Sequence, residues 1–380
     1  MKILNVIQGT HIGGMEQSSL LLMRELISLG HDISLLSLTK MGLLKKDLEE
    51  SNIKSRGFPY KGPGGLLDLL NYRSYISSEK ADAIMQTGHS LVGMLSLLGR
   101  KNIPKILFVH FHHQGVKPKW IWKLIYLVAN RIFHHIYFAS NFIMDEALLI
   151  HPELEKKSSF LPNPLPTRSI RTEKNISHSR SLYNIQSNEF VIGNAGWLIK
   201  RKRFDILLRV SAKIKESLPN LKVLIAGDGE EKVNLEELAD ELDISTDIIW
   251  LGWQEDLENF YNAIDVMLFN SDWDAVGLSP LESIQRGIPT YTSVINGGLK
   301  EILTGEFSIF IENQHDINIL ANKILESVYD NIEWTTKRAP GGKTTQGQQL
   351  VLKPGHDLRA AGYRVGKYKL VYNFLCHIIY

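Results

Sequence analysis

The chain has 380 residues, a formal net charge of +2, 44% hydrophobic residues and 22% charged residues. This length favours two domains over one, and the near-neutral charge gives no indication of a nucleic-acid partner. The single cysteine, Cys376, excludes an internal disulfide and is typical of a protein from a reducing, cytoplasmic compartment.

Short apolar runs alternate with amphipathic stretches along the first half of the chain, a pattern typical of an α/β protein with a parallel sheet. A strand is predicted at 3–7, a turn at Gly13 and Gly14, and a helix at 16–29 that ends at Gly30. Further strands are predicted at 33–38, 83–86, 106–110 and 136–139. No apolar run reaches the roughly 18 residues that a membrane-spanning helix needs, so none is expected.

The segment 161–166 interrupts this pattern with three prolines, and the polar stretch 167–188 that follows has no strand signal. Such a segment is typical of a linker, so we predict one domain at 1–166 and a second at 167–332. The second domain repeats the α/β pattern, with strands predicted at 190–194, 221–226, 248–251, 266–269 and 288–292 and helices at 204–218 and 235–242. Because parallel sheets bind ligands at the carboxyl ends of their strands, the expected site lies in a cleft between the two domains.

Two carboxylates, Asp274 and Glu282, flank a short segment with Gly277 at its centre. A glycine followed by a helical pattern predicts a strand-to-helix turn, and the free backbone N–H groups of such a turn can hold a phosphate. The flanking carboxylates can bind sugar or ribose hydroxyls. This segment is therefore predicted to hold a nucleotide-sugar at three points.

A basic cluster at 200–203, with the sequence Lys-Arg-Lys-Arg, follows a predicted strand and the turn at Gly196. Arg and Lys at this place can counter the charge of a nucleotide diphosphate and stabilise it as it departs. The alternative is a solvated helix start, although cations at a helix N-terminus oppose the helix dipole.

The glycine pair Gly13-Gly14 follows the first strand and opens a helix. The absence of a side chain at Gly14 would let a phosphate or a sugar approach the backbone, and the alternative is a plain tight turn. The G-x-G-x-x-G pattern of dinucleotide sites is absent here, which disfavours a nicotinamide cofactor.

His110, His112 and His113 stand at the end of a predicted strand. A lone histidine is more often structural, but three within four residues favour a functional site, with metal binding as an alternative. Asp272 and Asp274 offer a second alternative metal site, although two carboxylates without further oxygen ligands hold a divalent ion poorly.

Lysines alternate with tryptophans at 117–123, just before a strongly apolar helical pattern. Lys117, Lys119 and Lys123 next to Trp120 and Trp122 are typical of a peripheral contact with a membrane surface. The alternative is a core helix whose lysines extend to the solvent.

In their order and spacing, these motifs resemble those of glycosyltransferase family 4, a group of retaining enzymes with the GT-B fold that includes bacterial glycan-assembly enzymes. The segments that carry the resemblance are Gly13-Gly14-Met15-Glu16, Leu29-Gly30-His31, Pro162-Asn163-Pro164, Ala226-Gly227-Asp228-Gly229, Leu251-Gly252, 274–282 and 297–301. The resemblance covers residues 1–332. It implies two Rossmann-like domains that face each other across a cleft, with the acceptor side at 1–166 and the donor side at 167–332.

The resemblance also implies the activity and its residues. The enzyme would transfer a hexosyl or N-acetylhexosaminyl group from a nucleotide-diphosphate sugar, with a UDP-sugar as the first choice. The acceptor would be a glycan or a lipid-linked molecule. The transfer would retain the anomeric configuration and need no metal cofactor. The catalytic residues implied are His110, Lys202, Asp274 and Glu282. The donor-binding residues implied are Gly13, Gly14, Arg201, Lys202, Asp274, Gly277, Leu278, Ser279 and Glu282. Asp274 would contact the donor sugar, Glu282 the ribose, and the amides at 277–279 the distal phosphate.

Two positions depart from the family pattern. Trp197 stands where the family has an arginine after the glycine, with Arg201 as its candidate replacement, and Asp274 stands where the family has a longer glutamate. These departures leave open the alternative that the chain is a non-catalytic relative, which binds a sugar nucleotide or a glycan as a partner subunit. A GT-B epimerase or an oxidoreductase is the other alternative.

The last segment, 333–380, does not resemble the family. It is rich in Gly, Thr, Gln and Lys up to 355, carries an excess of basic residues, and becomes apolar at 368–380. We predict a basic tail, whose apolar end at 371–380 is a candidate to pack back on the first domain.

Overall fold

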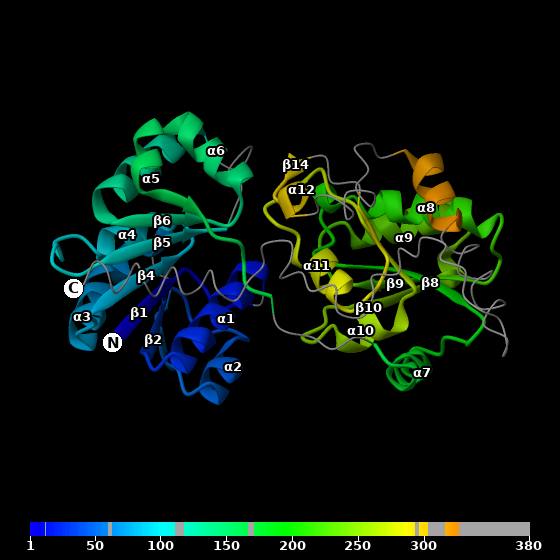
Figure 1. Ribbon diagram of the computed structural model, residues 1–380, viewed down its shortest axis with the longest axis horizontal. Helices are drawn as coiled ribbons and strands as arrows, with labels where there is room; N and C mark the ends of the chain where they lie inside the picture. The colour runs from blue at the N-terminus through cyan, green and yellow to red at the C-terminus, as the bar shows by residue number, and fades with distance from the viewer. Residues whose placement is uncertain are drawn as a thin grey trace, which may run out of the picture. The chain divides into compact units, whose positions relative to one another are not determined.

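The structure is a computed structural model. It describes residues 1–11, 13–59, 63–110, 118–165, 171–292, 296–302 and 316–326. These residues form two compact units, one before and one after the segment 166–170 (Figure 1). The predicted tail at 333–380 lies outside the described residues, as do His112, His113 and Lys117.

The first unit is built on one parallel sheet with the strand order β3-β2-β1-β4-β5-β6-β7. Its strands are β1 (Lys2–Ile7), β2 (Asp32–Ser37), β3 (Lys54–Gly57), β4 (Ala83–Thr87), β5 (Lys105–Val109), β6 (His135–Phe138) and β7 (Ser158–Phe160). The central strands are apolar runs because helices cover both faces of the sheet. The strand order reverses between β1 and β4, so the loops after these strands diverge at the carboxyl edge of the sheet.

Helices lie on both sides of this sheet, with α1 and α2 on one side and α5 and α6 on the other (Figure 1). The helices are α1 (Gly14–Ser28), α2 (Lys45–Glu50), α3 (Leu69–Glu79), α4 (Leu91–Ser96), α5 (Lys119–Ile132) and α6 (Asn141–Ile150), with 3-10 turns at Pro63–Asp68 and Pro152–Lys157. The buried face of α1, with Leu20, Met23 and Leu26, packs in one apolar core with Ile3 and Ile7 of β1.

The second unit repeats this plan with a parallel sheet of order β10-β9-β8-β11-β13. Its strands are β8 (Phe190–Ala195), β9 (Leu221–Ala226), β10 (Ile248–Gly252), β11 (Val266–Phe269) and β13 (Thr290–Thr292), with a separate pair formed by β12 (Trp273–Asp274) and β14 (Asn296–Gly297). Its helices are α7 (Glu173–Leu182), α8 (Phe204–Lys215), α9 (Lys232–Glu241), α10 (Glu258–Ala263), α11 (Leu278–Gln285), α12 (Leu299–Ile302) and a helix at 317–326, with 3-10 turns at Lys200–Lys202 and Ser245–Asp247. Both sheets are thus doubly wound, as the sequence predicts.

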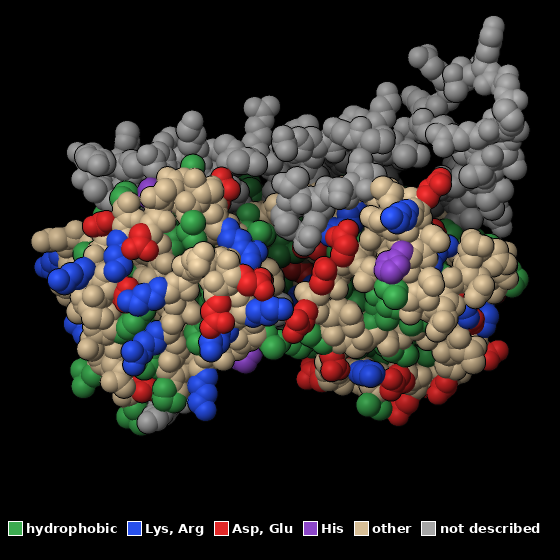
Figure 2. All heavy atoms as spheres, turned by 90° about the horizontal axis from the view of Figure 1, so that it is seen from below, with side chains coloured by type: hydrophobic (Ala, Val, Ile, Leu, Met, Phe, Trp, Pro, Cys, Tyr) green, Lys and Arg blue, Asp and Glu red, His purple; other side chains and the backbone are tan. Residues whose placement is uncertain are grey.

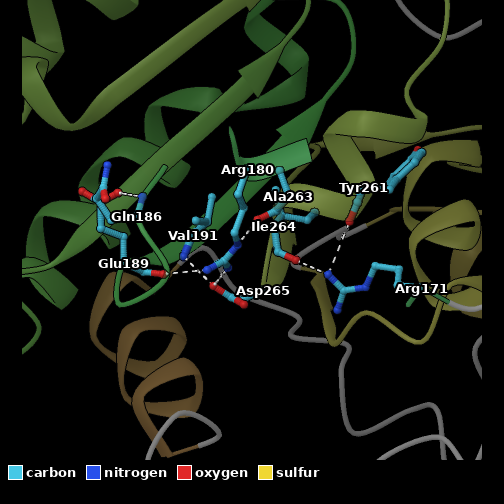
Figure 3. Close-up of polar contacts among 9 residues, drawn as sticks. All are labelled: Arg171, Arg180, Gln186, Glu189, Val191, Tyr261, Ala263, Ile264 and Asp265. Carbon is cyan, nitrogen blue, oxygen red and sulfur yellow. Dashed lines mark hydrogen bonds and ion pairs between the residues drawn. The ribbon is translucent and has the colours of Figure 1, made fainter. Parts of the chain in front are cut away.

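Helix α7 is a difference from the prediction, because it lies in the polar stretch that the sequence indicates as a linker. Its buried residues are Ser179 and Arg180 rather than an apolar stripe. Arg180 donates hydrogen bonds to the carbonyl oxygens of Ala263 (3.2 Å) and Glu189 (3.2 Å) and to Asp265 Oδ2 (2.6 Å), as Figure 3 shows. A largely buried guanidinium therefore attaches α7 to the second unit.

Basic and acidic side chains share the surface drawn in Figure 2, in keeping with the near-neutral net charge. Among the residues that the structure describes, no helix is both long enough and apolar enough to span a membrane.

Candidate functional site

The loops after β8, β9 and β10 are tied together by backbone hydrogen bonds at the carboxyl edge of the second sheet. The N–H of Gly196 donates to the carbonyl of Ala226 (2.9 Å), and the N–H of Gly227 donates to the carbonyl of Gly252 (2.8 Å). A Cβ atom at Gly227 would lie 1.9 Å from the Gly196 carbonyl oxygen, so this position accepts glycine alone. The result is a rigid rim of backbone at the edge where doubly wound sheets bind ligands.

Lys202 follows β8 on a 3-10 turn, and its ammonium pairs with the carboxylate of Asp274. Both side chains are 13% exposed. Arg201 contributes a second cation, since its Nη1 lies 3.7 Å from Asp274 Oδ2 and donates to the Trp273 carbonyl at 3.1 Å. Burial alone would raise the pKa of Asp274, but Lys202 and Arg201 outweigh it and hold that pKa below its ordinary value. The structure thus brings together three of the predicted site residues as a cluster of charges.

The backbone of Asp274 is fixed by the short strand pair β12–β14. Asp274 lies opposite Gly297 in this pair, and the N–H of Gly298 donates to the Asp274 carbonyl at 3.2 Å. A Cβ atom at Gly297 would lie 1.9 Å from that carbonyl oxygen. The close approach of the two backbones therefore requires glycine at 297 and sets the position of the carboxylate that holds Lys202.

Gly277 makes the turn between β12 and α11, as the sequence predicts. Its φ of 74° lies in the left-handed region that glycine adopts without strain. Helix α11 begins directly after it, so the N–H groups of Leu278 and Ser279 belong to the first turn, which has no carbonyl partners within the helix. Two residues separate this turn from Asp274. The Lys202 ammonium lies 4.8 Å from the centre of the Phe269 ring, and a Cβ atom at Gly277 would lie 3.4 Å from the same ring, so the ammonium lies near the start of α11.

Glu282 on α11 is held by a residue that the sequence does not indicate. Its Oε2 accepts a hydrogen bond of 2.9 Å from the hydroxyl of Tyr261, which is fully buried on α10. The guanidinium of Arg286 stacks over the Tyr261 ring at 4.3 Å and donates to the Glu282 carbonyl at 2.8 Å. Arg171, in turn, donates to the carbonyl of Tyr261 at 3.4 Å (Figure 3). Glu282 is therefore part of an ordered network and not a freely rotating surface side chain.

The two aspartates of the alternative metal site each face a cation. Arg203 Nη1 lies 3.1 Å from Asp272 Oδ1, and Lys202 pairs with Asp274. Such contacts are those of ion pairs rather than of a shared divalent ion. The described part of the chain contains no group of three or more His, Cys, Asp or Glu residues placed to hold a metal.

The predicted glycine loop of the first unit lies at the start of α1. Gly13 is the N-cap of this helix and Gly14 its first residue, directly after the loop that follows β1. Glu16 folds back over Gly13, with its Oε2 2.7 Å from where a Cβ atom of Gly13 would be. Burial raises the pKa of Glu16 to about 7, against the lowering effect of a hydrogen bond from its own backbone N–H. The loop therefore carries a carboxyl group that titrates near neutral pH.

This raised pKa gives a prediction for stability. The folded chain favours protonated Glu16, so its stabilising contribution is complete below pH 4.5 and is lost as the pH rises through about 7. We expect Glu16→Gln to stabilise the protein by about 2 kcal/mol at pH 8 and to change little at pH 4.5. Thermal unfolding at the two pH values measures this difference, and equal effects at both would contradict it.

His110 directly follows β5, and its half-buried side chain lies against the proline-rich segment. Its Nδ1 lies 2.7 Å from Oδ1 of Asn163, an oxygen that can only accept, so Nδ1 carries the proton. Burial lowers the pKa of His110 to about 4, while Asn163 opposes this shift. His110 is therefore neutral at physiological pH, and the carboxyl edge of the first sheet holds it with Thr87 and Ser19 around a small cavity.

Two family models match the chain, one in each unit. Residues 12–168 match the model described as Glycosyltransferase Family 4, and residues 176–339 match the one described as Glycosyl transferases group 1.

Individual proteins match the chain at low sequence identity. The chain is 28% identical over 156 residues to an uncharacterized glycosyltransferase of Methanocaldococcus jannaschii, covering 41% of this chain and 38% of that protein. It is 29% identical over 177 residues to the lipopolysaccharide core biosynthesis glycosyltransferase LpsE of Rhizobium meliloti, covering 47% and 51%. These matches thus span about half or less of the relatives' length. A longer match, 25% identical over 279 residues and 70% of each chain, is to the UDP-Gal:alpha-D-GlcNAc-diphosphoundecaprenol alpha-1,3-galactosyltransferase of Escherichia coli.

Solved structures show the same fold at low sequence identity. Anabaena Alr3699/HepE in complex with UDP-glucose superposes with a TM-score of 0.77 at 20% identity, over 88% of this chain and 91% of that one. TarM superposes with a TM-score of 0.72 at 11% identity, over 100% and 98%.

Proposed function

Because the chain belongs to the glycosyltransferases of group 1 and family 4 and has the GT-B fold, we propose that it transfers a sugar from a nucleotide-diphosphate sugar to an acceptor. The observation that carries this proposal is the ion pair between Lys202 and Asp274, which holds a cation near the turn at Gly277. A cation and a helix N-terminus together suit a diphosphate leaving group.

In this proposal different residues bind different parts of the donor. The ammonium of Lys202 and the guanidinium of Arg201 neutralise the diphosphate, and the N–H groups of Leu278 and Ser279 bind its distal phosphate. Glu282, oriented by Tyr261, accepts hydrogen bonds from the ribose hydroxyls. Asp274 holds Lys202 in place, and its contact with the donor sugar stays a prediction.

We propose that transfer proceeds with retention and without a metal. The acceptor oxygen bonds to the anomeric carbon on the face from which the diphosphate departs, and the hydroxyl proton passes to the departing phosphate oxygen. Lys202 and Arg201 supply the positive charge that this departing group needs. In this scheme neutral His110 is a catalytic residue, and Gly13 and Gly14 of the first unit help to bind the donor, as the resemblance implies.

The names of similar proteins support the choice of substrates. The relative in Escherichia coli uses UDP-Gal and an acceptor linked to diphosphoundecaprenol, and the structure of HepE contains UDP-glucose. We therefore propose a UDP-hexose or a UDP-N-acetylhexosamine as the donor, and a glycan or lipid-linked acceptor of a surface polysaccharide.

The donor site is tested by measuring nucleotide binding. We expect UDP and UDP-sugars to raise the melting temperature, and Glu282→Gln to weaken UDP binding about tenfold, or about 1.4 kcal/mol. With 2′,3′-dideoxy-UDP the variant should lose much less, since the hydroxyl partners are gone. Glu237→Gln, on the exposed face of α9, is the matched control. Equal losses for both nucleotides would remove the ribose role, and UDP-sugar binding without any turnover would indicate a non-catalytic binding subunit.

We also propose a peripheral membrane contact through α5, which suits a lipid-linked acceptor. The structure separates its two tryptophans, because Trp122 is buried in the core while Trp120 is 68% exposed. Trp120 shares the exposed side of the helix with apolar and basic residues, namely Leu124, Leu127, Lys119, Lys123 and Arg131. Such a face can insert apolar side chains between lipid headgroups while its cations meet anionic lipids.

This contact predicts a measurable effect. In flotation with anionic vesicles at low salt, we expect the protein to float and Trp120→Ser to reduce the bound fraction severalfold. Leu149→Ser, at an 81% exposed position of α6, is the matched control and should float like the unchanged protein. Absence of vesicle binding by the unchanged protein would overturn the proposal.

A further inference from the structure

Two tryptophans from the loops after separate strands meet at the carboxyl edge of the second sheet. Trp197 follows β8 and Trp253 follows β10, and their ring centroids are 4.6 Å apart with the planes inclined by 39°. Strand β9 lies between these two strands, so the rings meet across the loop that follows it. That loop contains Gly227 and Gly229, which carry no side chains to separate the rings.

This aromatic pair presents a large surface to the solvent. The large aromatic side chain of Trp197 is 47% exposed. Trp253 is half-buried, and its indole N–H is buried without a hydrogen-bond partner among the described residues. Large apolar rings are usually covered in a folded chain, and buried donors are usually paired. Both features are those of a binding surface completed by a ligand.

The position of the pair points to one part of the donor. Trp197 and Lys202 are five residues apart in the loop after β8, and that loop is hydrogen-bonded to the next one through Leu198 and Asp228 (2.9 Å). The aromatic pair thus shares a rigid rim with the cations assigned to the diphosphate. Trp253 lies at the β10 end of this rim, whereas α11 packs against β11 and β13. A nucleotide bound to those cations has only one flat aromatic group, its base.

Resting on the proposed function, we propose that Trp197 and Trp253 form a stacking platform for the nucleobase of the donor. Every base has a π-face, so the platform supplies affinity whichever base the donor carries. It also accounts for the departure at 197, where the family pattern has an arginine. The chain has exchanged a phosphate-binding cation at this position for a base-binding ring, and it keeps Arg201 beside Asp274 for the phosphates.

The test compares ligands with and without a base by calorimetry. We expect Trp197→Ala to weaken UDP binding about tenfold and to leave the binding of inorganic pyrophosphate unchanged. Trp197→Phe should recover most of the UDP affinity, because a flat ring remains. Trp120→Ala, which removes an exposed tryptophan from the first unit, should bind both ligands like the unchanged protein.

The outcomes separate this proposal from the function on which it rests. If the unchanged protein binds UDP, GDP or ADP and Trp197→Ala binds it equally well, the platform is overturned and the proposed function stands. Equal weakening of pyrophosphate and nucleotide would mean that Trp197 only supports the loop, which also overturns it. An unchanged nucleotide affinity with a raised KM for acceptor would assign the rings to the acceptor instead. If the unchanged protein binds no nucleotide, both proposals fall.

Discussion

Replacing Lys202 with methionine is expected to lower sugar transfer by about 100- to 1000-fold while weakening UDP binding much less. In the proposed mechanism the departing diphosphate gains charge as its bond to the sugar breaks, and the ammonium near the first turn of α11 meets that charge. Its contribution is therefore larger in the transition state than in the bound donor. Single-turnover rates with saturating donor measure this difference, and Lys200→Met on the same 3-10 turn, whose side chain is exposed, should keep full activity.

A second variant separates catalysis from folding. Lys202→Met leaves the carboxylate of Asp274 buried with only the more distant Arg201 nearby, which costs about 3 kcal/mol in stability. Adding Asp274→Asn removes the stranded charge, so the double variant should regain stability but not activity. Full transfer by Lys202→Met, or recovery of transfer in the double variant, would show that the ammonium is not the group that assists departure.

Replacing Arg180 with methionine is expected to destabilise the second unit by about 3 kcal/mol. The guanidinium serves three acceptors, the carbonyls of Ala263 and Glu189 and the carboxylate of Asp265, so its loss removes a donor from each of them. Arg180→Lys should recover little, because an ammonium cannot reach three divergent acceptors as a planar guanidinium does.

Scanning calorimetry measures this effect on the melting transition that we expect UDP to raise. Lys174→Met, at an exposed position of the same helix, is the matched control and should melt like the unchanged protein. Asp265→Asn should cost less than Arg180→Met, since Asp265 is 36% exposed and water can replace part of its interaction. An unchanged melting temperature for Arg180→Met would mean that α7 contributes nothing to the stability of its unit.

The central strands of both sheets could be predicted because their residues are buried on both faces. β4 and β11 are short, fully buried segments that begin with apolar runs, the pattern typical of a central strand in a parallel sheet. The edge strands β3 and β7 escaped prediction because their sequences, Lys-Ser-Arg-Gly and Ser-Ser-Phe, carry no such signal, being paired on one side only. Helix α7 was missed for a related reason, because a charged residue and not an apolar stripe attaches it.

In the candidate site, too, the features set by neighbouring residues could be predicted, whereas the contacts between distant residues could not. The turn at Gly277 is encoded within nine residues, and its helix begins where the sequence predicts. The partners of the site residues are distant in sequence: Lys202 and Asp274 are 72 positions apart, and His110 and Asn163 are 53 apart. Tyr261 has no motif of its own and is identified only because the fold brings its hydroxyl to Glu282. Residue types and local spacing therefore indicate which groups act, while the tertiary structure determines what holds them.

The contact between the backbones at Gly297 and Asp274 sets a rule for protein engineering. Any side chain at 297 would overlap the carbonyl oxygen of Asp274, so randomising this position would yield mostly displaced carboxylates and inactive clones. We predict that a change at 274 alters the donor sugar, and Asp274→Glu would lengthen the side chain while keeping the carboxylate that pairs with Lys202. A library that keeps 297 as glycine, limits 274 to Asp and Glu, and varies Trp197 would preserve the carboxylate that pairs with Lys202.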